Sequence, residues 1–288
     1  MDVFDLDAYV GRSRAVDLSA FDWDEVPRFP LPAAAIKTLL YMQNIESHTI
    51  FYLRELLATR VIDDNDITSF LACWLYEETS HGRALARFLE AAGVAVPPCE
   101  PSRVPWGAAM QSIGIAWASR VWPNFVAVHM SWGAINELIT LHGYRRLAEV
   151  ANHPTLSALL ARITRDESRH FAFYYQQAER RLQQPGVARV TRFLVQHFWE
   201  PVGTNIRGLD EARFLSAYLF SGDDGRAAAQ KVDQTIRRLP GFEGIPLLES
   251  WYDKYVRPTD AVSSASPQAP NQASSASMQA LSSAAEHH

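Results

Sequence analysis

The chain has 288 residues, of which 48% are hydrophobic and 20% are charged, and its formal net charge is −5. This composition is ordinary for a globular protein, and the negative charge argues against a nucleic-acid-binding protein. No apolar run approaches the ~20 residues that a membrane-spanning helix needs, so we expect no membrane partner. The two cysteines are too few for a disulfide framework, and the cytoplasm is the expected compartment.

The predicted elements begin with an N-terminal arm over residues 1–32, which lacks a regular period and ends in a proline-rich stretch. Apolar residues then recur at helical spacing over residues 33–60. The acidic turn Asp63–Asp66 offers an N-cap to a second helix over about residues 67–92, which Gly93 ends. These segments predict two long helices joined by a short turn.

Helical patterns continue through the second half of the chain. A stretch from about residue 106 is interrupted at Pro123, and long helices are predicted over about residues 124–151 and 155–183. Shorter helical patterns extend to about residue 255. No segment alternates with a period of two residues, so we predict an all-α fold.

The domain organisation follows from these patterns. Residues 33–257 are expected to form one helical domain behind the arm. From residue 258 to residue 288 the sequence is largely Ser, Ala, Gln and Pro, with almost no large apolar side chain. Such a segment cannot bury a core, so we expect a disordered tail.

Two Glu-x-x-His motifs, Glu78–His81 and Glu167–His170, are the most informative feature of the sequence. On a helix, residues three apart share a face, so each motif directs a carboxylate and an imidazole to one point. Another glutamate precedes each motif: Glu46 lies 32 residues before Glu78, and Glu137 lies 30 residues before Glu167. This order is typical of a dinuclear metal site inside a four-helix bundle.

A single Glu-x-x-His motif is weak evidence, because surface helices carry such pairs by chance. Here all four glutamates fall within apolar helical stripes, where an unpaired carboxylate is strongly disfavoured. Salt bridges are the competing explanation, but arginine is scarce on the same faces. Oxygen and imidazole ligands suit iron or manganese. The predicted metal ligands are Glu46, Glu78, His81, Glu137, Glu167 and His170.

Several neighbouring residues allow two interpretations. Asp166 is either the carboxylate that orients a metal-bound histidine or a solvated helix charge. Glu77 points about 100° away from Glu78, which favours a salt-bridge partner over a ligand. The remaining helical histidines off the ligand faces are interpreted as ordinary packing or surface residues: His48, His129 and His142.

At three segments the chain resembles the soluble acyl-carrier-protein desaturases of the ferritin-like superfamily: Glu77–Gly82, Asn136–Thr140 and Asp166–His170. The similarity extends over about residues 40–183. It implies a ferritin-like four-helix bundle with additional helices, in which the six residues above bind two iron ions and Glu78 bridges them together with Glu167. Manganese is the alternative metal.

The resemblance also implies a reaction. The protein would be a dioxygen-dependent oxidoreductase that removes hydrogen from an acyl chain on an acyl carrier protein and forms a double bond. Dioxygen would be the co-substrate, a ferredoxin-type protein the electron donor, and a homodimer the assembly. Thr140 would pass a proton beside the metals; the alternative is a helix threonine bonded back to a carbonyl.

Alternatives remain open at this point. The same ligand set would serve a diiron hydroxylase or N-oxygenase of a tailoring pathway, or a non-enzymatic ferritin-like iron-binding protein. Small residues near the ligands, Gly82, Gly133 and Ala134, either leave room for a substrate chain or let helices pack closely. A basic landing site for an acidic carrier protein is assigned to Arg54, Arg60, Arg83 and Arg87.

Overall fold

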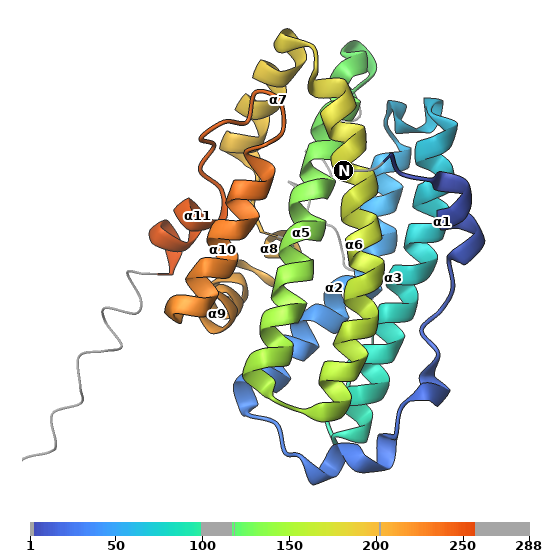
Figure 1. Ribbon diagram of the computed structural model, residues 1–288, viewed down its shortest axis with the longest axis vertical. Helices are drawn as coiled ribbons and strands as arrows, with labels where there is room; N and C mark the ends of the chain where they lie inside the picture. The colour runs from blue at the N-terminus through green and yellow to red at the C-terminus, as the bar shows by residue number, and fades with distance from the viewer. Residues whose placement is uncertain (1–2, 99–116, 118, 202, 257–288) are drawn as a thin grey trace, which may run out of the picture.

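The computed structural model describes residues 3–98, 117, 119–201 and 203–256. Within these ranges every regular element is helical and no strand occurs, so the all-α prediction is confirmed. Figure 1 shows long helices packed lengthwise, with shorter helices along one side. The described part of the chain contains no helix long and apolar enough to cross a membrane.

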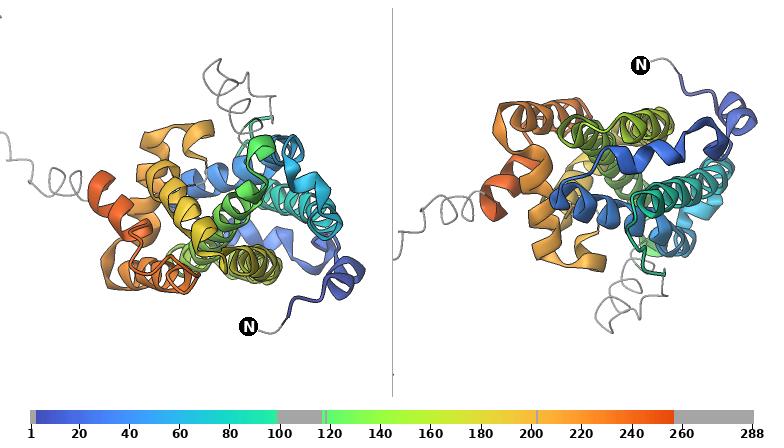
Figure 2. Two further views of the ribbon diagram at one scale, coloured as in Figure 1. Left: turned by 90° about the horizontal axis from the view of Figure 1, so that it is seen from above. Right: turned by 90° about the horizontal axis from the view of Figure 1, so that it is seen from below.

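Four long helices form a bundle: α2 (Ala33–Leu57), α3 (Asn65–Ala91), α5 (Val126–Ala151) and α6 (Pro154–Leu182). They match the four long helices that the sequence predicts. The helices α2 and α3 pair through a short connection that includes η3 (Arg60–Asp63), and α5 pairs with α6. Figure 2 shows the four packed side by side when the molecule is seen along its long axis.

Local sequence signals set the ends of these helices. The Asp64 side chain accepts hydrogen bonds from the backbone N–H groups of Asp66 and Ile67, as expected of an N-cap. Asn152 ends α5 in the left-handed conformation, with φ of 45°, and Pro154 occupies the first turn of α6. The helical stretch expected from about residue 106 lies largely outside the described residues; η4 (Pro123–Phe125) leads into α5.

The N-terminal arm has more structure than its sequence pattern suggests. It contains α1 (Leu6–Arg12), η1 (Leu18–Ala20) and η2 (Trp23–Arg28), and an aspartate side chain caps each of them. These elements span one or two turns, too short to produce a recognisable apolar period. Their anchoring side chains are buried against the bundle: Tyr9, Val16 and Val26. In Figure 1, α1 lies along the outer side of α3.

The described residues after α6 form five further helices: α7 (Pro185–Phe198), α8 (Thr204–Arg207), α9 (Leu209–Phe220), α10 (Gly222–Ile236) and α11 (Leu248–Tyr255). They agree with the shorter helical patterns of the sequence. Figures 1 and 2 show α9 and α10 beside α5, on the opposite side of the bundle from α1, and α11 packs against α9 and α10. The tail from residue 258 onward lies outside the described residues.

Candidate metal centre

The six side chains singled out by the sequence meet in the middle of the bundle. They form two groups in which one ligand atom from each residue lies within 4.8 Å of the others. The first group contains Glu46, Glu78, His81 and Glu167, and the second contains Glu78, Glu137, Glu167 and His170. Glu78 and Glu167 belong to both groups. Each group could hold a cation, and two such cations would share these two carboxylates.

Each long helix contributes to the cluster from a buried position. Glu46 comes from α2 and Glu137 from α5, while α3 and α6 each supply one Glu-x-x-His pair. None of the six residues is more than 7% exposed. Because the pairs at three-residue spacing lie on the inward faces of their helices, the two histidine rings come within 6.0 Å, centre to centre.

The histidine rings direct their Nδ1 atoms toward the shared carboxylates. Nδ1 of His81 lies 3.2 Å from Oε1 of Glu167, and Nδ1 of His170 lies 3.1 Å from Oε1 of Glu78. The opposite nitrogen of each ring contacts a carboxylate outside the cluster. Since a carboxylate can only accept, Nε2 carries the proton when the ring is neutral, and Nδ1 then offers a lone pair to a metal.

These outer carboxylates come from the opposite helix in each case. Oε2 of Glu77, on α3, lies 2.8 Å from Nε2 of His170, on α6. In return, Oδ2 of Asp166, on α6, lies 3.3 Å from Nε2 of His81, on α3. The residue before each shared glutamate therefore holds the histidine of the other motif. Asp166 takes the orienting position considered above and is not a solvated charge.

Positive side chains and a phenol fix the outer carboxylates. Arg169 donates to both of them, at 2.9 Å to Oε1 of Glu77 and through a short bond to Asp166. The predicted salt-bridge role of Glu77 is thereby confirmed. Arg162 donates to Oδ2 of Asp166 at 2.7 Å, and the Tyr9 hydroxyl donates to Oε2 of Glu77 at 2.9 Å.

The two glutamates that are not shared each accept one hydrogen bond from a buried aromatic residue. Nε1 of Trp74 donates to Oε1 of Glu137 at 3.1 Å, and the Tyr144 hydroxyl donates to Oε1 of Glu46 through a short bond. Each carboxylate is thus fixed by one oxygen. The second oxygen of each faces the cluster, Oε2 of Glu137 at 3.6 Å from Nδ1 of His170.

The cluster contains polar atoms that the described protein does not satisfy. Among the described residues, hydrogen-bond partners are lacking for Oε2 of Glu46, Oε1 of Glu78, both oxygens of Glu167, and Nδ1 of both His81 and His170. Buried polar atoms are almost always paired, so such a concentration calls for a bound group. Six inward-facing oxygen and nitrogen atoms with four carboxylates fit two divalent cations in charge and in ligand type.

The pKa values of the cluster also indicate that its carboxylates need positive charge nearby to remain ionised. Burial, followed by the charges of Glu78 and Glu167, raises the pKa of Glu46 well above its ordinary value. Burial is also the main cause that raises the pKa of Glu78, and it raises the pKa of Glu137 to about 8. Burial works against charge at Glu167 too, but contacts with both histidines lower its pKa. Cations in this space would stabilise all four carboxylates as anions.

The pKa values of the two histidines are also raised, and in a histidine this favours the charged form. Burial opposes their protonation, yet contacts with Asp166 and Glu167 carry the pKa of His81 well above its usual value. Contacts with Glu137 and Glu167 do the same for the pKa of His170. In the metal-free protein, protons on these groups partly balance the charge that metal ions would balance when bound.

Other residues discussed from the sequence have clear places in the structure. Thr140 lies half-buried one turn beyond Glu137 on α5, and its hydroxyl makes no hydrogen bond to another described residue, so the alternative, a bond back to a carbonyl, is not seen. His48 and His142 are buried, and His129 is half-buried; they lie outside both groups of the cluster.

The small residues near the cluster allow close helix packing. A Cβ atom on Gly133 would lie 2.4 Å from the ring of Tyr174, so α5 and α6 touch there. A Cβ atom on Gly82 would lie 2.9 Å from Oγ of Ser47, between α3 and α2. Ala134 is fully buried. Of the two interpretations, helix packing is the one that these glycines support.

The four arginines assigned to a carrier landing site are exposed but do not gather in one place. Gly82 on α3 contacts Ser47 on α2, and the two helices are antiparallel. Arg54 lies about 10 Å beyond Ser47 in one direction, and Arg87 lies about 8 Å beyond Gly82 in the other. Arg54 and Arg87 are therefore about 18 Å apart along the helices.

The aromatic residues that hold the cluster were not assigned from the sequence. Trp74 and Tyr144 fall on apolar stripes, where a large aromatic residue is expected in any core. Their N–H and O–H groups were the available signal, because a buried tryptophan or tyrosine needs a partner. Tyr9 had no signal at all, since the hydrogen bond to Glu77 spans 68 residues.

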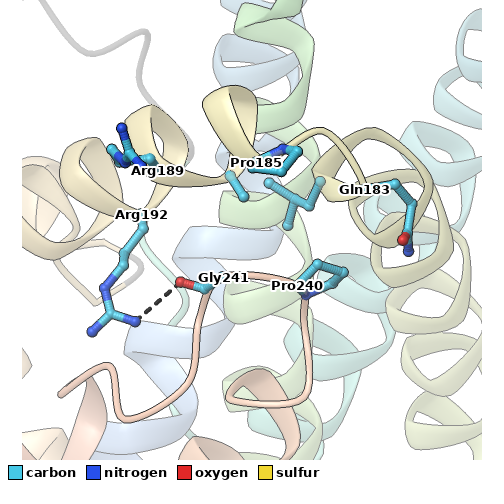
Figure 3. Close-up of a pocket in the computed structure, with 8 residues that line it drawn as sticks. Gln183, Pro185, Arg189, Arg192, Pro240 and Gly241 are labelled. Carbon is cyan, nitrogen blue, oxygen red and sulfur yellow. Dashed lines mark hydrogen bonds between the residues drawn. The ribbon is translucent and has the colours of Figure 1, made fainter.

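A surface cavity of about 370 Å³ lies away from the cluster, at the C-terminal end of α6. Figure 3 shows its lining by α7 and the turn at Gly241, to whose carbonyl Arg192 donates at 3.0 Å. Leu182, also in the lining, is 12 residues after His170, which places the cavity roughly 18 Å from the metal ligands along α6. It is not the space in which a substrate would meet the metals.

Residues 52–193 match the family model described as fatty acid desaturase. The matched segment contains five of the six residues of the cluster, and Glu46 precedes it. No curated protein and no solved structure matches the chain.

Proposed function

Since residues 52–193 belong to the fatty acid desaturase family, we propose that this protein is a dioxygen-dependent oxidoreductase that introduces a double bond into an acyl chain. The observation that carries the proposal is the pair of ligand groups sharing Glu78 and Glu167. Each group offers a histidine and several carboxylates, so the two groups together would hold the pair of metal ions that diiron oxygen chemistry needs.

The residues that would hold the metals are Glu46, Glu78, His81, Glu137, Glu167 and His170. A bound pair of iron ions supplies redox chemistry with dioxygen, which is required because acid–base side chains cannot break an unactivated C–H bond. The overall reaction balances as follows. The saturated chain, one dioxygen, two electrons and two protons give the unsaturated chain and two waters.

The protein's own part is positioning and exclusion of water. Glu77 and Asp166 hold the histidine rings with Nδ1 inward, while Trp74 and Tyr144 hold the outer oxygens of the unshared glutamates. Every ligand is buried, so bulk water does not compete at the reacting position. Thr140, half-buried beside Glu137, would pass a proton during the reaction.

The partners follow from the reaction. An acyl chain bound to an acyl carrier protein is the proposed substrate, and a ferredoxin-type protein is the proposed electron donor. Both assignments rest on family membership rather than on a surface of this molecule. A homodimer is the proposed assembly, and iron is favoured over manganese by the same membership.

The test is a direct assay of the product. Iron-loaded protein is incubated with dioxygen, reduced ferredoxin and acyl carrier proteins that bear saturated chains, and the acyl products are analysed by mass spectrometry. Loss of two hydrogen atoms is expected. Gain of one oxygen atom would instead identify a hydroxylase or N-oxygenase, and a cage-sized particle in light scattering with no turnover would identify an iron-binding protein of the ferritin type.

The role of Thr140 has its own test. Thr140→Val removes the hydroxyl while keeping the shape, so we expect full metal content but slower turnover. Thr164→Val is the matched control, because that hydroxyl is exposed and bonds to the carbonyl of Ala161. Equal turnover of both variants would remove Thr140 from the mechanism.

A further inference from the structure

One residue of the N-terminal arm reaches the surroundings of the metal centre. Most of the arm is exposed, but Tyr9 on α1 is only 3% exposed. Its hydroxyl donates to Oε2 of Glu77 at 2.9 Å, and the same oxygen lies 2.8 Å from Nε2 of His170. Glu77 is therefore the single residue between Tyr9 and His170 of the cluster.

At the Asp166–His81 pair, an arginine donates to the carboxylate in the way that Tyr9 donates to Glu77. Oδ2 of Asp166 accepts hydrogen bonds from Nε2 of His81 and from Nη1 of Arg162. Oε2 of Glu77 accepts hydrogen bonds from Nε2 of His170 and from the Tyr9 hydroxyl. In both cases a second donor on the same oxygen restricts rotation of the carboxylate that orients the histidine.

The arm is fixed to the bundle on both sides of Tyr9. Before it, the backbone N–H of Phe4 donates to Oε1 of Gln176 at 2.7 Å, and the Phe4 ring packs edge-on against Phe173. After it, the N–H of Val16 donates to Oγ of Ser80 at 2.7 Å. The position of the phenol hydroxyl is thus set by contacts with α3 and α6, the helices that carry the two motifs.

We propose that Tyr9 is a positioning residue of the metal centre, which fixes Glu77 and through it the ring of His170. This inference rests on the proposed two-metal site. The ring of Tyr9 packs against Phe70, with ring centres 5.1 Å apart, and a phenylalanine would preserve that contact. Only the tyrosine supplies a hydroxyl that donates to Oε2 of Glu77. The arm, which lies outside the segment matched to the family, thereby becomes part of the site.

The experiment measures cobalt binding, because Co²⁺ accepts the same nitrogen and oxygen ligands and reports its coordination by visible absorption. Wild-type protein, Tyr9→Phe, Glu77→Gln and the double variant are titrated with Co²⁺, each against its own metal-free form. Replacing the direct partner of a metal-bound histidine typically weakens binding about 10- to 100-fold, which is the expectation for Glu77→Gln. For Tyr9→Phe we expect a smaller effect, about threefold to tenfold, with an altered spectrum.

Tyr175→Phe is the matched control. Tyr175 is a buried tyrosine on α6, and its ring packs against Phe171, outside the cluster. Removal of the Tyr175 hydroxyl should leave the Co²⁺ affinity and the visible absorption spectrum unchanged. The double variant should bind no more weakly than Glu77→Gln alone, because Tyr9 acts through Glu77.

The outcomes separate this inference from the proposed function. Two Co²⁺ per wild-type chain, with Tyr9→Phe indistinguishable from wild type, would overturn the role of Tyr9 and leave the metal centre standing. Equal losses in Tyr9→Phe and Tyr175→Phe, or losses that add in the double variant, would also overturn it. Wild-type protein without Co²⁺ binding would remove the metal centre, and the role of Tyr9 with it.

Discussion

Glu77 on α3 and His170 on α6 are joined by a contact of 2.8 Å between Oε2 and Nε2, although 93 residues separate them in the chain. The relation between Asp166 and His81 is its mirror, at 3.3 Å. Each Glu-x-x-His helix therefore supplies the ligands of one motif and the carboxylate that orients the histidine of the other. The two helices cannot shift relative to each other without disturbing both rings.

Asp166, the counterpart of Glu77, gives the first prediction. Asp166→Asn keeps the shape of the side chain but removes the negative charge that accepts from His81, so we expect metal affinity to fall about 10- to 100-fold. Isothermal titration with Co²⁺ measures it. Asp233→Asn is the control, since Asp233 is a buried aspartate of α10 that accepts from the backbone of Leu248 and Glu249. Unchanged affinity in Asp166→Asn would contradict the orienting role.

Tyr144 gives a prediction about one metal position. Tyr144→Phe removes the donor to Oε1 of Glu46, which belongs only to the group that contains His81. The titration should become biphasic, with one ion bound more weakly and the other as in wild type. Loss of the hydrogen bond should also reduce the free energy of unfolding of the metal-free protein by about 1 kcal/mol. Equal weakening of both ions would argue against the separate groups.

Close packing between α5 and α6 gives a prediction about stability. In Gly133→Ala the new Cβ would meet the rigid, fully buried ring of Tyr174 at 2.4 Å, so we expect a loss of about 1–3 kcal/mol in the free energy of unfolding. Gly143→Ala on the same helix is the control, because its nearest neighbour is the flexible end of Met42 at 3.4 Å. That variant should be neutral or gain up to about 1 kcal/mol from helix propensity. Urea denaturation of both distinguishes packing from an open channel at Gly133.

His142 gives a prediction about pH. Burial, with the nearby charges of Arg145 and Lys231, lowers the pKa of His142 to about 4 in the folded protein. The unfolded chain, with a pKa near ~6.5, takes up a proton first as the pH falls, so the histidine destabilises the fold progressively below that pH. Above it, the histidine is neutral in both states and this penalty is absent.

The measurement compares wild type with His142→Gln in urea at pH 7.5 and pH 5.5. The wild type should lose about 1 kcal/mol more than the variant over this interval, allowing for partial solvent screening. Other titrating groups act equally in both proteins and cancel in the difference. An equal loss in both would show that His142 is protonated freely in the folded state.

The sequence allowed the bundle and the six residues of the cluster to be predicted because both depend on local spacing. Helical period places Glu78 and His81 on one face, and caps such as Asp64 mark where helices begin. The contacts that orient the cluster are not local. Glu77 lies about 100° from Glu78 around the helix, so its bond to His170 appears only once α3 and α6 are packed together.

The arm shows the same limit more strongly. Its turns are too short for a period, and nothing in the sequence around Tyr9 connects it with Glu77. The aromatic donors Trp74 and Tyr144 were visible as core residues, but their partners depended on how four helices meet. Spacing along one helix can be seen in a sequence, whereas contacts between helices follow from the packed fold.

Metal stoichiometry tests the central claim most directly. Protein loaded anaerobically with Fe²⁺ and freed of excess metal should contain two irons per chain by elemental analysis. Glu167→Ala should lose both, because Glu167 belongs to both groups, whereas His81→Ala should lose at least the one beside it. Glu90→Ala, an exposed glutamate on the same helix as His81, should keep two. Two irons retained in Glu167→Ala, or none bound by the wild type, would contradict the account.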